Sequence, residues 1–152
     1  VAEAIRDALG GEEIVYFGEP KPDIVADLYF VGSWTDKGSC DGTVGEYLKQ
    51  LEGKKLAVFG TAGYGGSREY YQKLACRVTE GVPDTSEVLG SFYCQGKMPI
   101  GVRNRYVAML REHPEDQKLN ASVKNFDEAL SHPDEKDFAD ARQWAQTMVD
   151  AV

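Results

Sequence analysis

The sequence predicts an α/β protein with one open, parallel sheet, and three observations support this. Short runs of β-forming residues alternate with amphipathic helical segments, the pattern of right-handed βαβ units. The run at 54–60 is almost continuously apolar, which is typical of a strand covered on both faces. The chain shows neither an internal repeat nor a linker, so residues 1–152 are expected to form a single domain.

Local periodicity defines each element in turn. The chain opens on a helix, because Val1, Ile5 and Leu9 share one face and Gly10 ends it. The next helix begins at Thr43, which is expected to form a capping box with Glu46. Strands are expected at 13–17, 27–32, 54–60 and 87–94, and helices at 43–51, 67–81, in two segments between 99 and 130, and from Pro133 to the end.

The net charge and the cysteine content argue against several classes of function. A net charge of −8 gives the chain no electrostatic means of holding nucleic acid or an anionic membrane, and it favours a basic partner. No apolar run is long enough to span a bilayer. The three cysteines, Cys40, Cys76 and Cys94, are widely spaced, which predicts reduced thiols in a cytoplasmic protein and no zinc site.

Two predicted loops carry the chemistry. Ligands of open parallel sheets bind beyond the carboxyl ends of the strands. The loop after Val31 reads GSWTDKGSCDG (32–42), and the loop after Phe59 reads GTAGYGG (60–66). Each places one large aromatic, Trp34 or Tyr64, among small residues that let backbone groups approach a ligand edge. Together they predict a site for a planar heterocycle, to which CQGKM (94–98) adds a third wall.

With LYFVGSWTDKG and LAVFGTAGYGG, the chain resembles the flavodoxin family over nearly its whole length. The final segment SHPDEKDFADARQWA is also similar to the last helix of many bacterial flavodoxin-like proteins. The resemblance implies a three-layer sandwich with sheet order 2-1-3-4-5. It also implies that the first strand and a phosphate-binding loop, together about 10–20 residues, precede Val1. The segment 97–131 departs from short flavodoxins and is expected to form an added helical hairpin.

The resemblance implies that FMN is the cofactor and that two loops hold its isoalloxazine ring. The implied cofactor-binding residues are Ser33, Trp34, Thr35, Asp36, Gly38, Thr61, Ala62, Gly63, Tyr64 and Gly65. No catalytic residue and no metal ligand are expected, which suits an electron-transfer protein. The implied partner is an oxidoreductase with a basic docking surface, and small proteins of this kind accompany reductases of bile pigments and other substrates.

Other functions remain open. A flavodoxin-fold NAD(P)H-dependent FMN or quinone reductase would use the 97–131 segment as a wall for a second substrate. A flavin-free binding module of the same fold is the second alternative. GTAGYGG does not match the dinucleotide-binding pattern G-x-G-x-x-G, since Arg68 stands where the third glycine is required, which argues against a Rossmann-type site. His113 and His132 are expected to have surface or capping roles.

Overall fold

Three parallel strands form the centre of the computed structural model, which describes residues 1–152. They are β1 (Tyr29–Asp36), β3 (Lys55–Ala62) and β4 (Glu87–Gln95), and the two-residue β2 (Ser39–Cys40) pairs antiparallel with the end of β1. The order across the sheet is β2-β1-β3-β4. The predicted open α/β sheet is therefore confirmed, with the three long strands adjacent in chain order.

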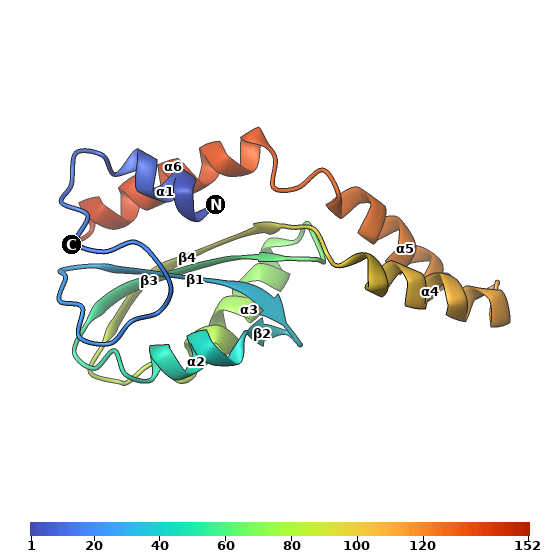
Figure 1. The fold of residues 1–152 in the computed structure, drawn as a ribbon, viewed down its shortest axis with the longest axis horizontal. Helices are drawn as coiled ribbons and strands as arrows, with labels where there is room; N and C mark the ends of the chain where they lie inside the picture. The colour runs from blue at the N-terminus through green and yellow to red at the C-terminus, as the bar shows by residue number, and fades with distance from the viewer.

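Helices cover both faces of this sheet (Figure 1). The helices α1 (Ala2–Ala8) and α6 (Glu135–Asp150) lie on one face, and α2 (Gly42–Leu48) and α3 (Arg68–Thr79) lie on the other. The alternation along β3 serves both layers: Leu56 and Val58 pack into the core on the α2–α3 side, whereas Phe59 packs on the α1–α6 side. This explains why the strand is apolar at successive positions.

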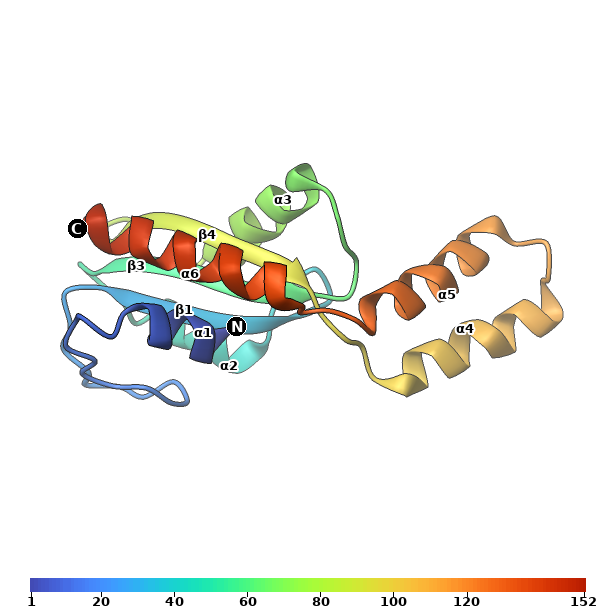
Figure 2. The same ribbon diagram turned by 90° about the horizontal axis from the view of Figure 1, so that it is seen from above.

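The predicted helical hairpin is present. The helices α4 (Ile100–Glu112) and α5 (Gln117–Ala129) pack on each other and project beyond the sheet edge where β4 ends (Figure 2). Within the hairpin, α5 buries Leu119, Phe126 and Ala129, while α4 has no buried residue. No helix of the structure is long and apolar enough to cross a membrane.

The strand predicted at 13–17 is wrong. These residues form irregular chain, and Ile14, Val15, Tyr16 and Phe17 are all exposed. A cavity of about 1300 Å³ lies between this segment and the outer edge of β1. Because a strand requires a neighbour for its backbone hydrogen bonds, the β-rich composition of 13–17 cannot produce one here.

The strand ends are also displaced from their predicted places. β1 continues through Trp34 to Asp36, and β3 continues to Ala62, so much of the predicted 32–42 loop is strand. The chain reverses at Lys37 and Gly38, whose φ values of +48° and +80° are those of a type I′ hairpin turn. The predicted capping box is wrong as well: Asp41 caps α2 by accepting from the N–H groups of Thr43 and Val44.

The core contains one unsatisfied hydroxyl, that of Tyr93, which has no hydrogen-bond partner. Burial raises the pKa of this phenol, and its ring stacks on Tyr71. We expect Tyr93→Phe to raise the free energy of unfolding by about 1 kcal/mol, because it removes a desolvated polar group without leaving a cavity. Urea unfolding measures this. Tyr71→Phe is the matched control and should not stabilise, since the Tyr71 hydroxyl accepts from the Gly66 N–H. A destabilised Tyr93→Phe would contradict the prediction.

Candidate functional site

Two exposed aromatic side chains stand at the carboxyl ends of neighbouring parallel strands. Trp34 lies near the end of β1, opposite Thr61 on β3, and Tyr64 follows β3 by two residues. Their exposed fractions are 58% and 46%, large for an indole and a phenol. Neither ring packs against another aromatic ring. Both side chains are therefore accessible to a ligand at this edge of the sheet.

The cavity beside β1 reaches the Trp34 side of this edge. Of the ten predicted site residues, Ser33, Trp34 and Thr61 line it, together with residues of α1 and of the 13–17 segment. Tyr64 does not line this cavity. The structure therefore brings three of the ten predicted residues together in one cavity and places Gly63, Tyr64 and Gly65 outside it, with Tyr64 close to the hairpin.

The loop that carries Tyr64 packs tightly on its surroundings. The Tyr64 hydroxyl lies 3.5 Å from that of Ser122 on α5, and hydrogen bonding with Ser122 and then Tyr106 lowers the pKa of the Tyr64 phenol. A Cβ at Gly63 would collide with the Met98 side chain, and a Cβ at Gly65 with the amide of Gln95. The glycines thus permit close approach of the end of β4 and the segment after it.

The remaining predicted site residues are engaged with the protein itself. The Thr35 hydroxyl donates to the Thr61 carbonyl at 2.8 Å. Asp36 and Gly38 belong to the β1–β2 turn. The Ala62 side chain is buried in the core, and its carbonyl accepts from the Gly96 N–H. These residues shape the sheet edge, and any contact they make with a ligand remains a prediction.

Ser33 and Asp41 form a small network that the sequence did not predict. The Ser33 hydroxyl donates to Asp41 Oδ2 at 2.9 Å and accepts from the Asp41 N–H at 3.1 Å. The other oxygen of the same carboxylate caps α2. The network fixes the backbone on both sides of the β1–β2 turn and so fixes the strand that carries Trp34.

The chemistry of this edge fits the ring of a flavin. The N–H groups of Gly63, Tyr64 and Gly65 donate to no acceptor in the protein. Unbonded N–H groups suit the oxygen and nitrogen acceptors along one edge of an isoalloxazine, and the exposed aromatics suit its faces. The residues at this edge therefore suit the isoalloxazine ring of the expected FMN.

Sequence reasoning missed the contribution of α5. Asn125 donates to the Gly63 carbonyl at 2.9 Å across 62 positions of sequence, and Ser122 meets Tyr64 across 58. Neither residue belongs to a recognisable local motif. The one sequence feature that pointed toward a contact between α5 and the Tyr64 loop was the expected hairpin, because it directly follows the last strand.

Cys94 ends β4 in a buried position. Burial, with a smaller effect from the charge of Asp137, raises the pKa of its thiol to about 12. The thiol is therefore protonated and unreactive at neutral pH. All three cysteines are free.

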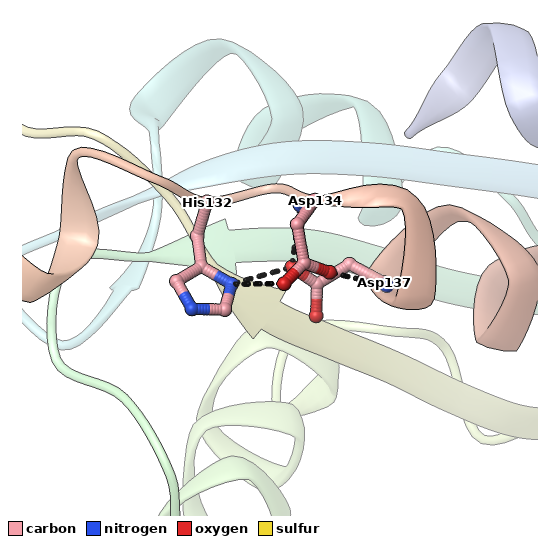
Figure 3. Close-up of side chains that lie close together, drawn as sticks. All are labelled: His132, Asp134 and Asp137. Carbon is pink, nitrogen blue, oxygen red and sulfur yellow. Dashed lines mark hydrogen bonds and ion pairs between the residues drawn. The ribbon is translucent and has the colours of Figure 1, made fainter.

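His132, Asp134 and Asp137 gather where the hairpin joins α6 (Figure 3). The two aspartates form a reciprocal capping box at the start of α6, and His132 Nδ1 lies 2.6 Å from Asp137 Oδ2. His132 therefore does not cap the helix itself but bonds to one of the two carboxylates that do.

The capping cluster makes stability depend on pH. The hydrogen bond to Asp137 raises the pKa of His132 above its ordinary 6.5, with a lesser contribution from the charge of Asp134. The stabilisation is therefore complete below pH 6.5 and is lost as the pH rises through the raised pKa. We expect His132→Gln to destabilise the protein more at about pH 5.5 than at about pH 8.5 in urea unfolding. An equal loss at both values would contradict this.

Comparison with known proteins points to one family. A family model described as "Flavodoxin domain" matches residues 1–146. The chain is 35% identical over 123 residues to "Flavodoxin-like domain-containing protein BilS" of Clostridioides difficile (strain CD3), covering 81% of this chain and 70% of the relative. It is 35% identical over 158 residues to a protein of the same description from Clostridium symbiosum (strain WAL-14163), covering 91% of this chain and 83% of the relative.

Proposed function

Because the chain belongs to the flavodoxin domain family, we propose that it binds FMN and passes electrons to a partner oxidoreductase. The observation that supports this best is the pair of exposed rings, Trp34 and Tyr64, at adjacent strand ends. Bound FMN would supply the one- and two-electron chemistry, while the protein binds and orients the ring.

The net charge of the chain supports a basic protein partner. The net charge is −8, so the surface as a whole attracts a basic docking face. Such a partner would form a small, transient interface near the exposed aromatics. A cytoplasmic reductase of a bile pigment or of another unsaturated substrate is the partner class that the family resemblance favours.

A second function follows from the position of the hairpin. The helices α4 and α5 project from the same edge that carries Tyr64, where they would wall a second planar substrate (Figure 2). An NAD(P)H-dependent FMN or quinone reductase uses such a space. The two proposals differ in one property: the reductase accepts hydride from NAD(P)H directly, whereas the carrier does not.

The test begins with FMN titration of the purified protein, followed by flavin fluorescence and the visible spectrum. We expect quenching of the flavin fluorescence and a shifted absorption band, since a stacked indole quenches flavin emission. Absence of binding at about 100 μM FMN, which corresponds to a binding free energy weaker than about −5.5 kcal/mol, would reject both flavin functions and favour the flavin-free module. Bleaching of the bound flavin by NADPH alone would favour the reductase.

A further inference from the structure

One carbonyl group of the Tyr64 loop is held by two side-chain amides from different elements. The Gly63 carbonyl accepts from Asn125 Nδ2 on α5 at 2.9 Å and from Gln95 Nε2 at the end of β4 at 3.1 Å. The two amides are also bonded to each other, Gln95 Nε2 to Asn125 Oδ1, at 3.2 Å. Both lone pairs of the carbonyl are therefore used, and the direction of this peptide group is fixed.

The fixed carbonyl determines where the neighbouring N–H points. The only cis peptide bond of the chain lies elsewhere, between His132 and Pro133, so the Gly63–Tyr64 peptide is trans. In a trans peptide the C=O and N–H bonds project in opposite directions. With the Gly63 carbonyl turned toward the hairpin, the Tyr64 N–H is turned away from it, and no group in the protein accepts its hydrogen.

The Gly63 carbonyl does not need two side-chain amides merely to have a hydrogen-bond partner. Tyr64 and Gly65 are exposed, so water could serve a carbonyl in this loop. Instead, two residues 30 positions apart converge on it. The hairpin packs sparsely on the sheet and its helices, so the contacts of Asn125 and Ser122 are among its few links to the body. The arrangement therefore couples the hairpin to the orientation of one exposed N–H group.

We propose that Asn125 and Gln95 are positioning residues for the flavin ring: they hold the Gly63–Tyr64 peptide so that the Tyr64 N–H donates to an acceptor on the edge of the isoalloxazine. The inference rests on the proposed FMN binding and adds to it a role for the hairpin. The two amides do not touch the ring. They act through the peptide group that they orient.

The variant Asn125→Ala is expected to raise the Kd for FMN about tenfold, the effect of one directed hydrogen bond. Riboflavin, which lacks the phosphate, should lose affinity by the same factor because the peptide contacts the ring. Gln95→Ala, which leaves the hairpin sequence intact, should act in the same direction. Asn120→Ala is the matched control, since this amide on the same helix bonds only to the Pro114 and Asp116 carbonyls near the hairpin turn.

A redox readout separates positioning from a structural role. Full reduction of FMN takes up two electrons and one proton and leaves the ring anionic, a state that an N–H donor stabilises. The midpoint potential of bound FMN, measured by dithionite titration against a reference dye, should therefore fall in Asn125→Ala and Gln95→Ala and stay constant in Asn120→Ala.

The outcomes are distinguishable. If the unaltered protein binds neither FMN nor riboflavin, the proposed function and this inference both fail. If it binds both and Asn125→Ala changes Kd less than twofold, only the positioning role fails. It also fails if Asn120→Ala weakens binding as much as Asn125→Ala, or if affinity falls for FMN but not for riboflavin. Parallel losses for both ligands with a lowered potential support it.

Discussion

Replacement of Trp34 by alanine is expected to weaken FMN binding about 30-fold, which corresponds to about 2 kcal/mol of stacking and buried apolar area. The side chain is 58% exposed, so most of its contact energy is available to a ligand and little of it stabilises the fold. The free energy of unfolding of the unliganded protein should therefore change by less than about 0.5 kcal/mol. Fluorescence titration with FMN measures the first quantity and urea unfolding the second.

Two further substitutions at Trp34 separate the effect of a flat ring from that of an apolar side chain. Trp34→Phe retains a flat ring and should lose only part of the affinity, whereas Trp34→Leu, apolar but not flat, should resemble the alanine variant. Met109→Ala is the control, because Met109 is an exposed apolar residue of α4 outside the proposed site. If Trp34→Ala binds FMN within twofold of the unaltered protein, Trp34 does not contact the ring and the proposed arrangement is wrong.

The second large effect concerns the hairpin. Phe126 is 1% exposed on α5, whose only extensive helical neighbour is α4. We expect Phe126→Ala to destabilise the hairpin by about 4 kcal/mol, because the truncated ring leaves a cavity at the buried face of α5. Since the hairpin packs sparsely on the body, the loss should be local. Amide hydrogen exchange is the suitable measurement: α4 and α5 should lose protection, while β3 keeps it.

Leu130→Ala is the control for Phe126→Ala, since Leu130 follows α5 and is largely exposed. Its effect should be within about 0.5 kcal/mol. A hairpin that opens also releases Asn125, so Phe126→Ala should weaken FMN binding by at least as much as Asn125→Ala. Unchanged exchange in α4 would show that the hairpin has a further source of stability and would contradict this prediction.

The sequence predicted correctly those elements that have a strong local pattern, either a continuous apolar run or a helical periodicity. The run at 54–60 became β3, ending two residues later than expected, because a continuous apolar run buried on both faces has few alternatives. The helical stretch before Ser131 became the two helices of the hairpin. By contrast, the segment 13–17 has strand composition but no neighbouring strand, and pairing is a non-local property that composition cannot supply.

The candidate site divides in the same way. Trp34 and Tyr64 were predicted from their places after apolar strands, and the structure leaves both exposed at one sheet edge. Asn125 could not be predicted, because its contact with Gly63 depends on how the hairpin folds back on the loop. The Asp41 cap was missed for a related reason: the tight turn at Lys37 and Gly38 moved the start of α2 and brought Asp41 beside Ser33.

The outer edge of β1 can accept a further extended segment. From Tyr29 to Ser33 the strand pairs only with β3, and its other side presents backbone donors and acceptors to the adjoining cavity. An unprotected edge of this kind is a template on which a second extended chain can assemble. An extended segment that pairs with Tyr29–Ser33 would therefore widen the sheet on this side and fill the cavity.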